Sequence, residues 1–222
     1  VRGYTIRSGV GCFRAFRGAG VKRIDLPDAG HNPNFIGTWM LEPPSLCDDI
    51  VTFFEAHPGL QRAGATAGGT NSDVKKSTDI VIQPAAIAEP GNELFRNYFD
   101  ALFGCYTDYL AQWPFIETFL PRIEIGSFNI QRYQPGDHFQ RVHTERASLS
   151  GLHRVFAWMT YLNDVEDGGA TYFPHYDLAV QPAAGKTLIW PAEWTHAHAG
   201  QVLNSGVKYI VTGWMHFPFT SE

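Results

Sequence analysis

The sequence predicts an α+β fold with a C-terminal jelly roll and bracing helices ahead of it. Three observations indicate this class. Short β-branched and aromatic runs, separated by Gly, Pro, Asn or Asp, follow one another after residue 120. Two stretches with helical spacing of apolar residues come before them. The chain also has 16 Phe, 9 Tyr and 6 Trp, and such bulky side chains favour cross-strand packing.

The first 120 residues are predicted to be mainly irregular and helical. Short strands are expected at Val21–Leu26 and Phe35–Leu41. The stretch 43–59, "PPSLCDDIVTFFEAHPG", predicts a helix with Ser45 as its cap and Pro-Gly at its end.

A second, longer helix is predicted over residues 90–114, where Leu94, Phe95, Tyr98 and Leu102 recur at helical spacing. Between the two helices, residues 61–79 are small, polar and Gly-rich. They predict a mobile loop, and a lid and a plain surface loop remain equal interpretations.

Residues 121–222 are predicted to form the jelly-roll core of a single domain that spans residues 1–222. The expected strands lie in "RIEIGSFNIQRY", "HRVFAWMTYLND", "ATYFP", "KTLIWP" and "VKYIVTGWMHF". The stretches "QPGD", "NDVEDGG", "QPAAG" and "NSG" between them are rich in turn residues. With the helices placed first, we expect them to brace one face of the sheet.

Composition narrows the class of function. The net charge is −5, so no basic excess points to nucleic acid. No apolar run approaches the roughly 20 residues needed to cross a bilayer, and the N-terminus lacks an apolar signal core. Three widely spaced cysteines favour a reducing compartment over a disulfide framework. The expected location is therefore cytoplasmic, although the chain does not begin with Met.

Histidines and one glutamate suggest a metal site. His143 and Glu145 in "HTE" stand two residues apart, as do His196 and His198 in "WTHAHAG". Residues i and i+2 of a strand point the same way. Two His and one carboxylate on one face are typical of non-haem Fe(II) oxygenases. A lone HxE recurs by chance, so surface or core histidines remain the alternative at this point.

Several motifs, including "HTE", occur in an order that resembles that of a known family. The stretches "NIQRYQPGDHFQRVHTE", "YLNDVEDGGATYFP", "VQPAAGKTLIWP" and "HAGQVLNSGVKYIVTGWMH" run in order from Asn129 to His216. This part resembles the catalytic core of prolyl 4-hydroxylase-type 2-oxoglutarate/Fe(II) dioxygenases. The resemblance implies a double-stranded β-helix, the jelly roll that the strand pattern also predicts.

The resemblance implies the metal ligands, which are also the catalytic residues. His143 and Glu145 match the family's HxD pair, and His198 matches the distal histidine. His196 is the lesser candidate for the distal position. Glutamate is one methylene longer than the aspartate that the family usually has. The retained carboxylate speaks against halogenation, because halogenating relatives have lost it.

Further matches imply the cosubstrate site. Lys208 follows His198 by ten residues and matches the cation that binds the distal carboxylate of 2-oxoglutarate. A buried ammonium needs an anionic partner, which agrees with that role. Tyr133 and Tyr161 match tyrosines that hydrogen-bond the cosubstrate, and Thr171 is a weaker candidate for the same task.

Arg154, Trp214 and His216 match positions that face the peptide substrate in prolyl hydroxylases. One family feature is missing: an acidic residue often found seven positions before the first pocket tyrosine is Gly126 here. Glu124 is near this position, without an established equivalence.

The function implied is hydroxylation of prolyl residues in a peptide or protein, with release of succinate and CO2. It would use Fe(II), 2-oxoglutarate and O2, with ascorbate as an accessory. The same chemistry on a free amino acid or small metabolite is one alternative, and a metal-binding jelly-roll module without oxygenase activity is another. A zinc hydrolase is a third, although no HExxH-type general base supports it.

Overall fold

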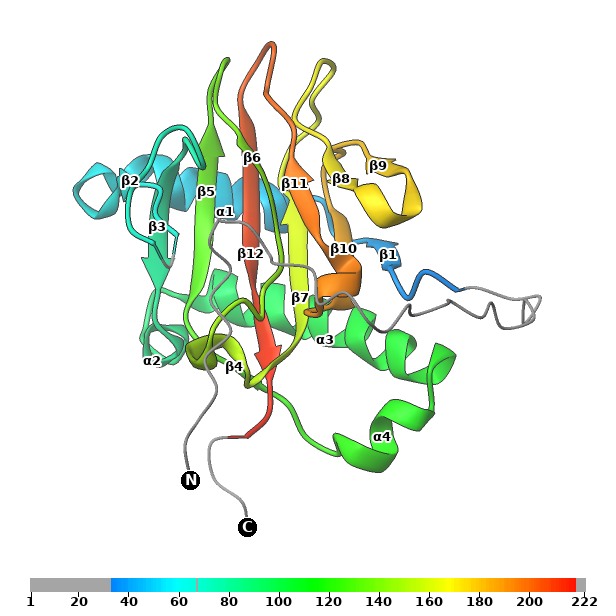
Figure 1. Cartoon of the computed structure of the whole chain (residues 1–222). Coiled ribbons are helices and arrows are strands. Elements are labelled where there is room, and N and C mark those ends of the chain that lie inside the picture. The colour runs from blue at the N-terminus through cyan, green and yellow to red at the C-terminus, as the bar shows by residue number, and fades with distance from the viewer. Residues whose placement is uncertain (1–32, 67, 219–222) are drawn as a thin grey trace, which may run out of the picture. The chain divides into compact units, whose positions relative to one another are not determined.

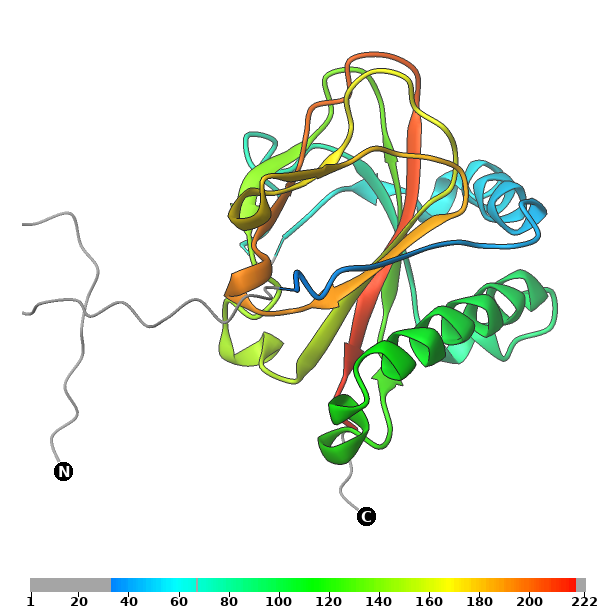
Figure 2. The ribbon, with the colours of Figure 1, turned by 90° about the vertical axis from the view of Figure 1, so that its right-hand side faces the viewer.

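Two antiparallel sheets face each other in the part of the chain that the structure, a computed structural model, describes: residues 33–66 and 68–218 (Figure 2). The large sheet has the order β1 (Gly37–Met40), β10 (Lys186–Pro191), β7 (Arg154–Tyr161), β12 (Lys208–His216), β5 (Phe128–Tyr133), β3 (Thr78–Ile82) and β2 (Arg62–Ala63), with β4 (Glu124–Ile125) beside β12 (Figure 1). The small sheet has the order β6 (Phe139–His143), β11 (His198–Gly200), β8 (Thr171–Phe173) and β9 (Leu178–Val180). The predicted jelly roll is therefore confirmed.

Helices cover the outer face of the large sheet (Figure 2). They are α1 (Ser45–Ala56), α2 (Pro84–Ile87), α3 (Glu93–Gln112) and α4 (Phe115–Phe119), and short 3-10 turns occur at η1 (Pro58–Leu60), η2 (Leu149–Gly151), η3 (Pro174–Tyr176) and η4 (Trp194–His196). Both predicted helices are confirmed as α1 and α3. The predicted cap is wrong: Ser45 is already helical, Pro44 occupies the N-cap, and no side chain caps this end.

Apolar side chains of both helices pack with the outer face of the large sheet. Ile50 and Phe54 of α1 and Phe95 of α3 belong to one buried cluster with Phe128 and Trp158 of the sheet. Burial of a large side chain of this kind stabilises a fold by about 1.5–3 kcal/mol. The helices therefore hold the large sheet from behind and leave its other face for the small sheet.

Strand alternation decides which side chains point between the two sheets. Along β12, Val211 and Met215 belong to the helix-side cluster, whereas Ile210 belongs to the cluster between the sheets and Trp214 packs against it. Successive side chains of a strand point to opposite faces. Lys208 has the same parity as Ile210, so its side chain also enters the space between the sheets.

The first 120 residues supply more of the sheet than their sequence indicates. The strand expected at Phe35–Leu41 is β1, which pairs with β10. The Gly-rich stretch 61–79 includes β2 and the start of β3, and β3 pairs with β5. The large sheet thus extends beyond residues 121–222. The strand expected at Val21–Leu26 lies outside the described residues, and the described residues from Asn34 onward form one compact unit.

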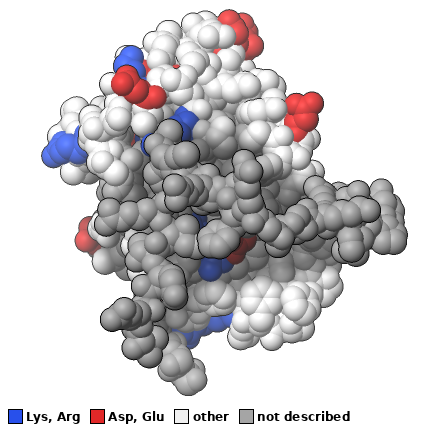
Figure 3. All heavy atoms as spheres, viewed as in Figure 1, with Lys and Arg blue, Asp and Glu red and all other residues white. Residues whose placement is uncertain are grey.

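Positively and negatively charged side chains are interspersed on the described surface. On the visible described part of the face in Figure 3, Lys and Arg side chains and Asp and Glu side chains lie scattered, without a continuous patch of one sign. Among the described helices, none is long and apolar enough to span a membrane.

Candidate metal centre and cosubstrate pocket

Three potential metal ligands converge at one end of the small sheet. His143 ends β6 and His198 begins β11, and these two residues are direct cross-strand partners. Glu145 lies two residues beyond the end of β6. One ligand atom from each of the three side chains lies within 4.8 Å of the others. The strand pairing thus brings together residues that are more than 50 positions apart in the sequence.

Backbone carbonyls orient both imidazole rings. The Nδ1 atom of His143 lies 2.9 Å from the Arg141 carbonyl oxygen, and Nδ1 of His198 lies 3.0 Å from the His196 carbonyl oxygen. A carbonyl only accepts, so each Nδ1 carries the proton and donates it. Each Nε2 atom then has its lone pair available, which is how metal-bound histidines are usually held.

The available lone pairs face the carboxylate. Glu145 Oε1 lies 3.3 Å from Nε2 of His198 and 3.7 Å from Nε2 of His143. Three electron-rich atoms this close repel one another unless a cation or a proton lies among them. The donor set, two imidazole nitrogens and one carboxylate oxygen, suits a divalent transition metal such as Fe(II) and leaves positions open for further ligands.

The ionisation of these groups also suits metal binding. Burial, helped by the nearby His198, lowers the pKa of His143 to about 4 despite the opposing charge of Glu145, so its ring is neutral at pH 7. Burial alone would raise the pKa of Glu145. The protonated forms of His198 and His143 outweigh burial and lower this pKa to about 2, so a cation beside these rings keeps Glu145 ionised. Neutral imidazole and ionised carboxylate are the forms that bind metals.

Aromatic side chains surround the two rings. Phe139 stacks on His143 with centroids 3.9 Å apart. Trp190 and Phe173 pack against His198 with centroids 5.0 and 5.6 Å away. These contacts limit the rotation of both rings and keep the surroundings apolar, which strengthens interactions with a charge at the centre.

His196 does not belong to this cluster. Its Nε2 lies 2.7 Å from the Asn34 carbonyl oxygen and 3.3 Å from the Tyr176 hydroxyl. Its Nδ1 lies 3.0 Å from the Thr195 hydroxyl. Both ring nitrogens therefore have partners away from the cluster, and its backbone carbonyl instead supports His198. The geometry favours His198 over His196 as the distal ligand.

The second oxygen of Glu145 points away from the histidines. Oε2 accepts a hydrogen bond of 2.7 Å from the indole Nε1 of Trp214. The Arg154 guanidinium lies 3.6 Å from Oε2, donates to the Glu145 backbone carbonyl at 3.0 Å, and sits 3.6 Å from the Trp214 ring centroid. Two residues predicted to face the substrate thus contact the candidate metal ligand.

Lys208 enters the space between the sheets as a buried cation. Its side chain is on the inner face of β12, and the residue is 3% exposed. Nζ donates to the Gly169 carbonyl at 2.8 Å and lies 4.3 Å from the Tyr133 ring centroid. Gly169 has φ of 68°, and a Cβ there would lie 3.2 Å from Lys208 Cδ, so glycine permits this close approach.

The positive charge of Lys208 has no carboxylate beside it in the described part of the chain. No ion pair joins it to a carboxylate within residues 33–66 and 68–218. Burial lowers its pKa to about 8. An isolated buried ammonium is unfavourable without an anion, so this end of the space between the sheets fits an anionic ligand such as the distal carboxylate of 2-oxoglutarate.

The other predicted cosubstrate residues line the same region. The Tyr133 hydroxyl donates to Gln131 Oε1 at 2.7 Å. The Tyr161 hydroxyl lies 2.6 Å from Thr171 Oγ1 and 3.0 Å from the Val180 carbonyl oxygen. Both hydroxyls thus have protein partners, and their bonds to a cosubstrate stay a prediction.

His216 is the last residue of β12. It is buried, and its ring centroid lies 5.0 Å from that of His153. A Cβ at Gly126 would lie 3.1 Å from His216 Nε2, so an acidic side chain at position 126 would require His216 to move. Glu124 is the cross-strand neighbour of His216. The substrate role of His216 stays a prediction.

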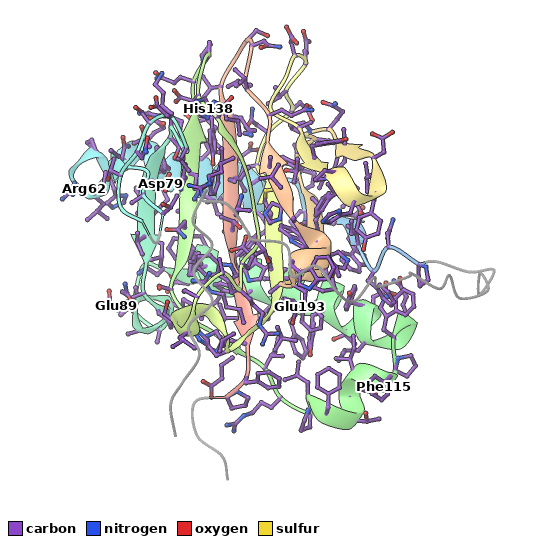
Figure 4. All side chains as sticks on the ribbon, in the orientation of Figure 1. Arg62, Asp79, Glu89, Phe115, His138 and Glu193 are labelled. Carbon is purple, nitrogen blue, oxygen red and sulfur yellow. The ribbon has the colours of Figure 1, made fainter. Side chains whose placement is uncertain are left out.

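The stretch 61–79 contains a buried polar network that its Gly-rich sequence does not indicate. Lys75 is 4% exposed and its Nζ lies 2.5 Å from Asp79 Oδ2. Asp79 also accepts from Ser77 at 2.7 Å and from Gln131 at 3.3 Å, and Gln131 holds the Tyr133 hydroxyl. Figure 4 labels Asp79 on β3 and Glu193 near η4, on either side of β12 in this view. The i, i+2 spacing of Ser77 and Asp79 was the available signal.

Comparison with known proteins agrees with this geometry. Residues 128–216 match the model of the 2OG-Fe(II) oxygenase superfamily. The matched stretch contains the strands β5 to β12 and all three candidate metal ligands. Over part of its length the chain is similar to prolyl 4-hydroxylases.

The sequence relatives are prolyl 4-hydroxylases. The chain is 28% identical over 92 residues to prolyl 4-hydroxylase subunit alpha-2 of Gallus gallus, covering 38% of this chain and 17% of that protein. It is 29% identical over 104 residues to the human alpha-1 subunit, covering 42% and 20%. It is 28% identical over 124 residues to probable prolyl 4-hydroxylase 9 of Arabidopsis thaliana, covering 44% and 43%. The chain therefore spans less than half the length of these relatives.

Solved structures show the same fold. A Pseudomonas putida prolyl-4-hydroxylase aligns with a TM-score of 0.65 at 16% identity, covering 82% of this chain and 93% of that one. A viral collagen prolyl hydroxylase from Paramecium Bursaria Chlorella virus-1, in a 2OG complex, aligns with a TM-score of 0.59 at 16% identity, covering 83% and 97%. A prolyl hydroxylase from Trichoplax adhaerens, in complex with a hypoxia inducible factor peptide fragment, aligns at 0.63 and 15% identity, covering 82% and 84%.

Proposed function

We propose that this chain is a 2-oxoglutarate- and Fe(II)-dependent hydroxylase of prolyl residues in a peptide or protein. The observation that carries the proposal is the pairing of two sites between the sheets. One is a cluster of three lone-pair-bearing ligand atoms, and the other is a buried lysine that has no carboxylate partner among the described residues. A cation with a chelating dianion would satisfy both sites.

His143, Glu145 and His198 would hold the metal, and Lys208 would hold the distal carboxylate of 2-oxoglutarate. Fe(II) with 2-oxoglutarate and O2 supplies the oxidation: a C–H bond becomes C–OH while 2-oxoglutarate becomes succinate and CO2. The protein supplies orientation, neutral imidazoles and an environment from which water is largely excluded. An accessory role for ascorbate stays a prediction.

The choice of a proline-containing peptide as substrate rests on the relatives, which are prolyl 4-hydroxylases. One structural neighbour is a complex with a peptide fragment. A free amino acid or small metabolite would use the same metal and cosubstrate residues.

The first test is anaerobic addition of 2-oxoglutarate to the Fe(II)-loaded protein, observed for a metal-to-ligand charge-transfer band. The second is aerobic incubation with a library of proline-containing peptides, with free proline and other amino acids in parallel. We expect succinate in equal amount to peptide that has gained one oxygen atom. Oxygen gain by a free amino acid alone would replace the peptide assignment, and absence of the band would leave a metal-binding module without oxygenase activity.

A further inference from the structure

The two oxygens of Glu145 have different surroundings, and this difference bears on metal coordination. Oε1 faces the histidines, 3.3 Å from Nε2 of His198 and 3.7 Å from Nε2 of His143. Oε2 faces the opposite way and accepts the indole N–H of Trp214 at 2.7 Å. The carboxylate therefore presents one oxygen to the metal position and the other to a donor.

Carboxylates bind metals through one oxygen or through both. Glutamate has one more rotatable bond than aspartate, so an unrestrained Glu145 is free to turn both oxygens toward a metal. Two imidazoles, a bidentate glutamate and a chelating 2-oxoglutarate would together fill six positions. No position would then remain for O2 in an octahedral site.

We propose that Trp214 is a positioning residue that keeps Glu145 monodentate and so keeps one coordination position open. The indole N–H donates to Oε2 in a charge-assisted hydrogen bond, which is stronger than a hydrogen bond between neutral groups. This inference rests on the proposed function, since it concerns the same metal and cosubstrate.

Arg154 fixes the indole that makes this bond. Its guanidinium lies 3.6 Å from the Trp214 ring centroid, and Nη1 donates to the Glu145 backbone carbonyl at 3.0 Å. One arginine thus restrains both the ring of Trp214 and the main chain of Glu145. Alternation along β12 aims Trp214 into the space between the sheets, where it packs against the inner cluster.

The test compares Trp214→Phe with wild-type protein and with Trp39→Phe. Trp39 makes a bond of the same kind, from its Nε1 to Asp108 Oδ2 at 2.9 Å. Trp39 packs with the helix-side core, away from Glu145, so Trp39→Phe controls for loss of an indole–carboxylate bond as such.

Two signals are measured in anaerobic protein loaded with Fe(II) and 2-oxoglutarate. The charge-transfer band reports that metal and cosubstrate are bound. Nitric oxide, added next, binds ferrous iron only at a free position and gives an electron paramagnetic resonance signal. We expect Trp214→Phe to keep the band and to lose about tenfold or more of the nitric oxide signal, the scale of effect typical for residues that support a ligand. Trp39→Phe should keep both signals.

A second variant distinguishes loss of the N–H donor from disturbed packing or misfolding. Trp214→benzothienylalanine keeps the shape of the ring and replaces the N–H with sulfur, so it removes only the donor. It should reproduce the loss of the nitric oxide signal. A nitric oxide signal of wild-type strength in both position-214 variants would overturn the inference while leaving the proposed function in place. Absence of the charge-transfer band from wild-type protein would instead overturn the proposed function, and the inference with it.

Discussion

The two ends of the space between the sheets differ in how completely their polar groups are partnered. At the metal end, each imidazole Nδ1 has a carbonyl within 3.0 Å, and Glu145 Oε2 has the indole of Trp214. At the other end, the buried Lys208 ammonium has one carbonyl and an aromatic face, without a carboxylate in the described chain. The protein thus fixes the orientation of the ligands for a metal but leaves a positive charge for a ligand to neutralise.

This difference predicts that the two ends respond differently to mutation. Loss of a metal-end side chain should remove the metal and, with it, everything that depends on the metal. Loss of Lys208 should leave the metal in place and weaken only the anion. Loss of a ligand side chain at the metal end should therefore have larger effects than substitution of Lys208.

Replacement of a candidate ligand should have the largest effect. His198→Ala should weaken binding of Fe(II) by at least about 100-fold, beyond the loss typical for a supporting residue. His196→Ala is the matched control, because His196 lies two residues away and both of its ring nitrogens have other partners. Calorimetric titration of each apo variant with Fe(II) under argon measures the effect. Stronger loss in His196→Ala than in His198→Ala would reverse the ligand choice.

Removal of the buried cation should have the next largest effect. Lys208→Met should weaken 2-oxoglutarate binding by roughly 10- to 100-fold, because a hydrogen bond to a charged group contributes about 1.5–3 kcal/mol. Fe(II) binding without 2-oxoglutarate should not change. Lys186→Met is the control, since Lys186 also donates to a carbonyl, Gln181, but near the surface. Equal affinities of wild type and Lys208→Met, measured by titrating the charge-transfer band, would remove Lys208 from the site.

The pH dependence of 2-oxoglutarate binding should follow Lys208. Burial lowers the pKa of this lysine to about 8, so the free protein loses the positive charge as pH rises through 8. The bound dianion favours the charged form, and binding above this pH must therefore take up a proton. Affinity should fall by up to about tenfold per pH unit above pH 8.

Lys208→Arg provides the comparison, because a guanidinium keeps its charge throughout this range. Its affinity for 2-oxoglutarate, whatever its value at pH 7, should stay flat from pH 7.5 to about 9.5. A wild-type profile as flat as that of the arginine variant would show that Lys208 does not titrate in this window.

The smallest effect is expected from shortening the metal-end carboxylate. Glu145→Asp removes one methylene and gives the HxD pattern usual in the family. We expect it to retain iron, with affinity within about tenfold of wild type, and to lose part of its turnover, since the shorter side chain must satisfy the same metal and indole. Turnover is measured as succinate release in the presence of a peptide that the wild-type protein hydroxylates. Undiminished turnover would mean that the extra methylene has no consequence.

The fold could be predicted from the sequence largely because local signals were strong. Runs such as "VKYIVTGWMHF" and the helical spacing around Phe95 and Tyr98 carry their own periodicity, and both elements are found. β6 and β11, the strands that present the histidines, are short and were not among the expected strand runs. Their pairing depends on contacts across the small sheet, which the local sequence does not encode.

The candidate site could be predicted residue by residue only through the resemblance. The proximity of His143, Glu145 and His198 follows from that alignment, but the roles of Trp214 and Arg154 beside Glu145 do not. The hydrogen bond between Trp214 and Glu145 joins residues that are far apart in the chain, so the local sequence does not indicate it. The sequence around Lys75 likewise indicates only a Gly-rich loop, because the burial of Lys75 depends on Asp79 and the neighbouring strands.

The most direct test of the account is an anaerobic titration of the Fe(II)-loaded wild-type protein with 2-oxoglutarate. Since the metal end and Lys208 would bind one molecule together, we expect a metal-to-ligand charge-transfer band that saturates at one 2-oxoglutarate per iron. The band should be absent in His198→Ala and should require far more 2-oxoglutarate in Lys208→Met. A wild-type protein that binds Fe(II) but gives no band at saturating 2-oxoglutarate would contradict the account.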